Sequence, residues 1–178
     1  MKNIAIISAS VRTGRLSHRV ALYFKRYLED NNLAAAEILD LKEYNFPVFD
    51  ERLRLQKEPS PAAMEFAGKV KTADGIIIVT PEYNGGYPAS LKNAIDLLYD
   101  EWHHKPVAIS TVSDGIFGGS QVITSLQFTL WKMGVSIVKA MFPVPRVMDN
   151  FDENGIPSDE NSTGKRASNF IRELLSSI

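Results

Sequence analysis

Short apolar runs alternate along this chain with stretches in which apolar residues recur at helical spacing. The runs at residues 4–7 and 76–79 are continuous and rich in β-branched side chains, which is typical of strands buried on both faces of a parallel sheet. The same pattern predicts five strands in all, at residues 4–7, 36–41, 75–80, 106–112 and 136–141.

Apolar residues spaced three or four positions apart predict helices between these strands and after the last one. The predicted helical faces lie within residues 20–28, 64–70, 91–98, 122–133 and 167–175. Strands that alternate with helices indicate an α/β fold with a parallel sheet covered on both sides. We find no internal repeat and no linker, so residues 1–178 are expected to form a single domain. The proline-bearing stretches at 43–61 and 143–161 are predicted to be irregular, the second as a long loop.

Composition narrows the classes of function. The chain is 44% hydrophobic and 23% charged, with a net charge of -1. It lacks the excess of basic residues that nucleic-acid-binding proteins usually carry, which argues against that class. It has no cysteine, so thiolate nucleophiles, Cys-ligated zinc and iron–sulfur clusters are excluded. Its N-terminal apolar run is too short for a signal peptide, and no run is long enough to span a bilayer. We therefore expect no membrane partner and a cytoplasmic location.

The first predicted strand is followed by a polar turn that is suited to an anion. Residues 8–17 read Ser-Ala-Ser-Val-Arg-Thr-Gly-Arg-Leu-Ser and lead directly into a helix. The N-terminus of a helix offers unpaired N–H groups and a positive dipole, and arginine donates two parallel hydrogen bonds to phosphate. The alternative is a solvated loop in which Ser17 only caps the helix. The position after the first strand of an α/β chain favours anion binding.

The absence of several known phosphate-binding motifs from this turn limits the kinds of phosphate ligand that it could bind. The turn contains neither the dinucleotide fingerprint G-x-G-x-x-G nor the Walker motif G-x-x-x-x-G-K-[ST]. A cysteine phosphatase is excluded, and the acidic pair of a phosphoacceptor receiver domain is absent. A monophosphate such as that of FMN remains, and FMN requires further loops to hold its ring.

Two further loops meet that requirement. Residues 81–88 follow the third strand and combine two glycines with the amide of Asn84 and the aromatic rings of Tyr83 and Tyr87. Residues 113–119 follow the fourth strand and form another glycine-rich turn before a helix. Loops at the carboxyl ends of parallel strands share one edge of the sheet, where ligands bind in open α/β folds. The sequence therefore predicts one site for a planar heterocycle at this edge.

At these residues the chain resembles the NAD(P)H-dependent FMN reductase family, a flavodoxin-like branch that includes quinone, azo and chromate reductases. The family motif P-E-Y-N-x-x-x-P-x-x-L-K-N-A-I-D is matched in full from Pro81 to Asp96. A G-S-x-R motif aligns with residues 9–12, where Ala9 replaces the usual glycine, and a loop ending in F-G-G aligns with residues 113–119. The resemblance implies a three-layer sandwich with a five-stranded parallel sheet in the order 2-1-3-4-5.

The resemblance also implies which residues bind FMN. Ser10, Arg12 and Ser17 would hold the phosphate; we add Arg15 from its charge and Leu16 from its place in the same turn. The residues expected around the flavin ring are Pro81, Glu82, Tyr83, Asn84, Ser113, Gly115 and Gly118. No catalytic side chain is expected, because FMN carries the hydride chemistry. The adjacent His103 and His104 do not predict a metal site.

The function expected from this resemblance is ping-pong electron transfer. NADPH or NADH would reduce the bound FMN, and a small acceptor such as a quinone, azo compound, flavin or metal oxyanion would then be reduced. A homodimer or homotetramer is expected, with Tyr99 and Trp102 as candidate contacts because aromatic residues are enriched in interfaces. The alternatives are a flavodoxin-like electron carrier that does not oxidise NAD(P)H, and a non-catalytic phosphate-binding module.

Overall fold

The computed structural model describes residues 1–178 and contains one five-stranded sheet. The strands are β1 (Asn3–Ser8), β2 (Ala35–Asp40), β3 (Gly75–Pro81), β4 (Pro106–Val112) and β5 (Ser136–Val144). All neighbouring strands are parallel, and their order is β2-β1-β3-β4-β5. The predicted fold class and strand order are confirmed. The central strands are apolar at almost every position because helices cover both of their faces.

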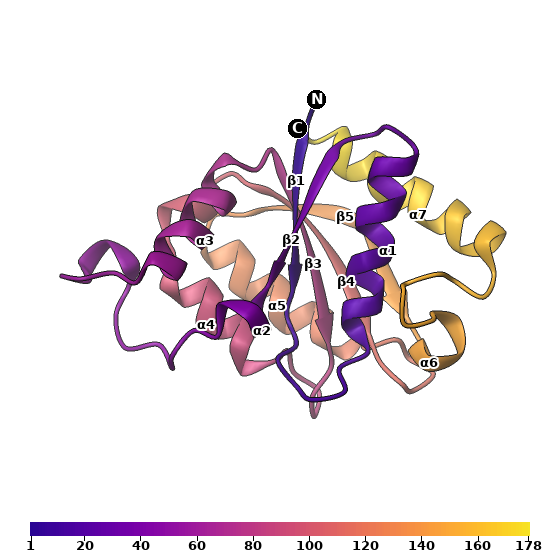
Figure 1. The fold of residues 1–178 in the computed structure, drawn as a ribbon, viewed down its shortest axis with the longest axis horizontal. Coiled ribbons are helices and arrows are strands. Elements are labelled where there is room, and N and C mark those ends of the chain that lie inside the picture. Colours follow the sequence, from indigo (N-terminus) through magenta and orange to yellow (C-terminus); the bar gives the residue numbers. More distant parts are fainter.

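The helices form a layer on each side of the sheet (Figure 1). The main helices are α1 (Ser17–Asp30), α3 (Pro61–Thr72), α4 (Ala89–Leu97), α5 (Gln121–Lys132) and α7 (Glu160–Leu175). One core cluster joins α1 and α7 to Ile4, Ile6 and Ile77 of the sheet. The other joins α3, α4 and α5 to the alternate residues of the same strands, including Ile7 and Ile76. Successive side chains of a strand point to opposite faces, so one apolar run supplies both cores.

The C-terminal third departs most from the predicted elements. Strand β5 continues to Val144, beyond the predicted end at residue 141, and a register shift between Val107 and Ile109 accompanies its pairing with β4. The short helix α6 (Val147–Asn150) lies in the stretch predicted to be a long loop, and earlier in the chain α2 (Leu41–Tyr44) begins at the last residue of the predicted second strand. Helix α7 begins at residue 160, well before its predicted apolar face, because Asp159 caps it by accepting a hydrogen bond from the Ser162 N–H.

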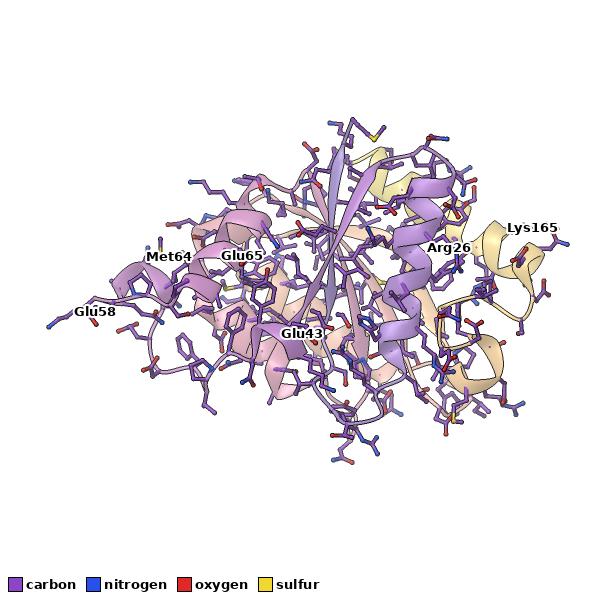
Figure 2. All side chains as sticks on the ribbon, viewed as in Figure 1. Arg26, Glu43, Glu58, Met64, Glu65 and Lys165 are labelled. Atoms are coloured by element: carbon purple, nitrogen blue, oxygen red, sulfur yellow. The ribbon has the colours of Figure 1, made fainter.

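The segment between α6 and α7 packs closely against α1. Arg26, labelled in Figure 2, donates hydrogen bonds to the carbonyls of Asn154 and Gly155, and Arg19 donates to the carbonyl of Phe151. Gly155 has a φ of +73°, and a Cβ there would lie 2.3 Å from the Arg19 carbonyl oxygen. Only glycine permits so close an approach between two backbones.

One sequence-based expectation about subunit contacts is wrong. Trp102 is fully buried, and its indole N–H donates to the carbonyl of Ile95, so it belongs to the core that α3, α4 and α5 form with the sheet. Tyr99 is half-buried and stacks with the Arg52 and Arg54 guanidinium groups, and its expected role as a subunit contact stays a prediction. None of the helices has the length and apolar character that a membrane crossing requires.

Candidate functional site

The loops that follow β1, β3 and β4 meet around one cavity of about 330 Å³ at the carboxyl edge of the sheet. The β1 and β3 loops lie together at the lower edge of the view in Figure 1. Predicted site residues that line the cavity are Ser10, Arg12, Arg15, Leu16, Ser17, Pro81, Glu82, Tyr83 and Ser113. Asn84, Gly115 and Gly118 are not part of its lining, which instead includes Val112, Asp114 and Val147.

The turn between β1 and α1, residues 9–16, forms the polar end of the cavity. Leu16 occupies the N-cap position of α1 with no side-chain cap, so Ser17 is not the capping residue that the alternative interpretation required. The Ser17 hydroxyl is buried and has no hydrogen-bond partner within the protein. A buried hydroxyl without a partner is costly, and the uncapped first turn carries the positive end of the helix dipole. This turn therefore fits an anionic, hydrogen-bond-accepting group such as a phosphate.

The two arginines of this turn are placed differently. Arg12 is exposed at the rim of the cavity, and none of the ion pairs in the structure includes it. Arg15 is largely buried and binds both carboxylate oxygens of Asp40 at the end of β2. Its Nη1 also donates to the Ser10 carbonyl at 2.8 Å. The guanidinium of Arg12 is thus available to a ligand, while that of Arg15 is engaged within the protein.

Asp40 and His18 complete a polar cluster beneath the turn. Burial alone would raise the pKa of Asp40, but hydrogen bonds from Arg15 and the Lys42 N–H, with the guanidinium charge, lower it. His18 Nδ1 lies 3.0 Å from Ser8 Oγ and 3.7 Å from an oxygen of Asp40. Burial, assisted by the charge of Arg15, lowers the pKa of His18, which favours the neutral imidazole. Neither residue was predicted from the sequence, although both stand at the carboxyl edge, where Asp40 ends β2 and His18 lies in the first turn of α1.

Hydrogen bonds join the β1 turn to the loop after β3. Ser10 Oγ and the Tyr83 hydroxyl lie 2.7 Å apart, and Ser90 Oγ donates to the Ala9 carbonyl at 2.6 Å. Tyr83 and Gly86 exchange two backbone hydrogen bonds around a tight turn whose central residues, Asn84 and Gly85, have positive φ angles. The amide of Asn84 therefore sits at the tip of the loop, while Tyr83 faces the cavity.

The loop after β4 contributes one polar wall and is fixed by close packing. Ser113 lines the cavity, and its hydroxyl donates to the Gly115 carbonyl at 3.1 Å. Gly118 has a φ of +62°, and a Cβ there would lie 3.0 Å from the Pro145 nitrogen and 3.1 Å from Pro143 Cβ. These contacts place Gly118 against the end of β5. Its expected position beside a ligand ring stays a prediction.

Comparisons with known proteins identify relatives along most of the chain. Residues 2–149 match the NADPH-dependent FMN reductase family. A NAD(P)H-dependent FMN reductase of Saccharomyces cerevisiae is 34% identical over 148 residues, which cover 76% of each chain. A NAD(P)H-dependent FMN reductase of Nectria sp. is 32% identical across all of this chain and 94% of its own. A quinone reductase of Escherichia coli is 36% identical over 124 residues, covering 66% of this chain and 63% of its own.

Solved structures share the fold at lower sequence identity. The NAD(P)H:acceptor oxidoreductase FerB of Paracoccus denitrificans superposes with a TM-score of 0.78 over 98% of this chain and 96% of its own, at 21% identity. A NAD(P)H:quinone oxidoreductase of Methanothermobacter marburgensis gives a TM-score of 0.63 over 98% of each chain, at 17% identity. At these identities the structural likeness supports the architecture alone.

Proposed function

This chain belongs to the NADPH-dependent FMN reductase family, and we propose that it is an FMN-containing oxidoreductase that takes electrons from NADPH or NADH. The observation that carries this proposal is a single cavity at which the uncapped N-terminus of α1 meets the loops after β3 and β4. The buried Ser17 hydroxyl, which has no partner within the protein, lies at the polar end of that cavity.

The β1 turn would hold the phosphate of FMN. Ser17 Oγ and the first N–H groups of α1 would donate hydrogen bonds, and Arg12 would add a charge-assisted contact from the rim. This set supplies donors and positive charge without a metal ion, which suits a phosphate monoester. We expect the same donors to bind a dinucleotide pyrophosphate poorly, because the turn lacks the G-x-G-x-x-G pattern that permits its close approach.

The β3 and β4 loops would border the isoalloxazine ring. Pro81, Glu82 and Tyr83 line one side of the cavity, and Ser113 with Asp114 lines another. The Glu82 N–H donates to the Val112 carbonyl, so this backbone is already fixed before a ligand arrives. A fixed, preorganised wall reduces the entropy that is lost on binding. We assign no general acid or base to these side chains.

When bound, FMN would supply the two-electron hydride chemistry that links NAD(P)H to a second substrate. The protein's part is to bind the cofactor, to orient its ring and to leave one face open to both substrates in turn. We propose ping-pong kinetics and a small acceptor, such as a quinone, an azo compound, a flavin or a metal oxyanion. We also propose that the protein acts as a homodimer or homotetramer.

Anaerobic reduction tests the proposed activity. Purified protein is reconstituted with FMN, oxygen is removed, and NADPH or NADH is added in separate experiments while the flavin absorbance is followed. Rapid bleaching by at least one donor is expected. A bound flavin that neither donor bleaches would indicate the electron-carrier alternative, and the absence of bound flavin would overturn the site.

Replacing Arg12 tests the phosphate assignment separately. R12A removes an exposed cation from the rim of the cavity, so FMN affinity should fall about tenfold while riboflavin affinity changes little. R172A on α7 removes an exposed arginine far along the chain and is the charge-matched control. Equal effects of R12A and R172A on FMN affinity would contradict the assignment.

A further inference from the structure

The cluster beneath the phosphate turn contains an ion pair that the proposed chemistry does not use. Arg15 comes from the turn after β1, and Asp40 is the last residue of β2. Their side chains are 12% and 11% exposed, and the guanidinium reaches both carboxylate oxygens. Two charges so far removed from water are tolerated only as partners, because either one alone would be left uncompensated.

The pair is also joined to the backbone of the turn and to that of α2. Arg15 Nη1 donates to the Ser10 carbonyl at 2.8 Å, and the Ser10 hydroxyl lies 2.7 Å from that of Tyr83. Asp40 accepts in addition from the Lys42 N–H at 3.0 Å, which fixes its own backbone at the start of α2. A continuous set of contacts thus runs from the end of β2, through Arg15 and Ser10, to the loop after β3.

This geometry separates the roles of the two arginines. A phosphate that took Arg15 as its ligand would have to displace the Asp40 carboxylate, leaving a buried negative charge close to a bound anion. Arg12 can reach a phosphate at no such cost, since no carboxylate pairs with it. The sequence alone suggested the same role for both side chains.

We propose that Arg15 and Asp40 are positioning residues that hold the β1 turn in its phosphate-binding shape without binding the phosphate themselves. The inference rests on the proposed function, because it concerns the phosphate of the cofactor assigned there. It assigns a role to Asp40, a residue that lies outside the cavity lining. It also predicts that losing the Asp40 charge weakens phosphate binding, although removing a nearby negative charge would by itself strengthen it.

The test compares FMN with riboflavin, which lacks the phosphate. Dissociation constants are measured for both flavins with wild-type protein and D40N, by quenching of flavin fluorescence. Asn keeps the shape of the side chain and can still cap α2. The dissociation constant of D40N for FMN should rise about tenfold, while that for riboflavin changes less than about twofold. Unchanged riboflavin binding shows that the variant is folded.

Glu43 offers a matched control for the change in charge. It lies on α2 near the same cluster, is exposed, and takes part in none of the ion pairs (Figure 2). E43Q removes one negative charge without touching Arg15, so its FMN affinity should stay unchanged or rise slightly. If D40N behaves like E43Q, the positioning role is overturned, because Arg15 would then be free to act as a direct ligand.

Two variants of Arg15 provide a second measurement. R15K keeps the positive charge but cannot contact both carboxylate oxygens of Asp40 as the guanidinium does. It should therefore weaken the binding of FMN more than the binding of riboflavin. In R15M the Asp40 carboxylate is left unpaired near the phosphate, and R15M/D40N should recover part of the lost FMN affinity. Additive effects in this double-mutant cycle would contradict a pair that acts as a unit.

The outcomes also distinguish this inference from the proposed function. A wild-type protein that binds no FMN, or binds FMN no better than riboflavin, would overturn the proposed phosphate site and the pair's role with it. A wild-type protein that prefers FMN, and whose D40N and R15K variants keep the same preference, would overturn the positioning role alone.

Discussion

At the scale of single residues, the Ser17 hydroxyl gives the clearest indication of a ligand. It is buried at the first position of α1 without a partner, whereas the buried hydroxyls of Ser110 and Thr111 donate to backbone carbonyls. Burying a hydroxyl without a hydrogen-bond partner costs the free energy of its desolvation. A ligand that hydrogen-bonds to this hydroxyl would recover that cost, so the unpaired group indicates a binding site.

Replacing Ser17 should therefore separate stability from binding. In S17A the flavin-free protein should be as stable as the wild type or more stable by up to about 1 kcal/mol, because an unsatisfied group is removed. FMN affinity should fall at the same time. Chemical denaturation and flavin titration measure the two effects.

Ser110 is the matched control for this prediction. Its hydroxyl donates to the Phe142 carbonyl at 2.9 Å, so S110A should destabilise the flavin-free protein by about 1 kcal/mol. A loss of similar size in S17A, with FMN affinity unchanged, would mean that Ser17 has a structural role only.

The sequence predicted residue types at the site better than their individual roles. Ser10, Arg12, Ser17 and Tyr83 follow strands in an order that places them at one edge, and the structure places all four on one cavity. The partner of Arg15 lies in another strand, so its engagement depends on a tertiary contact that no local pattern contains. Gly118 is explained by packing against β5, which is equally non-local.

At the scale of elements, the start of α1 combines a helix N-terminus with a half-buried histidine, His18. His18 faces Arg15, Asp40 and Glu43, and its pKa lies below the ordinary value of 6.5 because of burial and the charge of Arg15. The unfolded chain therefore binds a proton at this residue more readily than the folded protein does. Stability is accordingly lost as the pH falls through 6.5 toward the lower folded pKa.

We therefore predict that His18 makes the free energy of unfolding depend on pH. The free energy of unfolding should decline below about pH 6.5, and H18Q should decline less steeply over that range. The carboxyl of Asp40 has a lowered pKa and contributes stability that is lost only further into acid, below its ordinary value of 3.8. The difference between the wild-type and H18Q denaturation curves over this range isolates the contribution of the histidine. Parallel curves for the wild type and H18Q would contradict the assignment.

The segment before α7 shows what the hydrophobic pattern did not reveal. Prolines, acidic residues and asparagines made residues 143–161 look like one long loop, but the end of β5, all of α6 and the start of α7 lie within it. The remaining turn is held against α1 by the buried ring of Phe151 and by hydrogen bonds from Arg26 to the carbonyls of Asn154 and Gly155. Hydrophobic periodicity cannot report that kind of interaction.

Gly155 is the residue on which that contact depends most. In G155A the new Cβ would meet the Arg19 carbonyl oxygen at 2.3 Å and the Tyr23 nitrogen at 2.9 Å, at a φ of +73°. We expect a loss of about 3 kcal/mol in unfolding free energy, measured by denaturant titration.

Gly164 in α7 provides the opposite control. No heavy atom lies within 4 Å of a Cβ at that position, so G164A should stabilise the helix by about 0.5–1 kcal/mol. A G155A protein as stable as the wild type would show that this segment does not pack on α1 in the manner described.

At the scale of the whole molecule, strand order determines where chemistry can occur. The chain crosses from β1 outward to β2 and returns past β1 to β3, so the loops after β1 and β3 diverge to opposite faces of the sheet. Ligands bind in the crevice that such a reversal opens. Alternation of strands and helices was sufficient to predict a doubly covered sheet, while the order itself came from the family resemblance.

The central claim is that FMN bound in this crevice carries electrons from a nicotinamide to a small acceptor. The most direct measurement is an anaerobic titration of FMN-loaded protein with NADPH and with NADH, followed by addition of a quinone. The account predicts that at least one donor bleaches the flavin mole for mole and that the quinone restores its absorbance. A flavin that stays oxidised with both donors would contradict the claim.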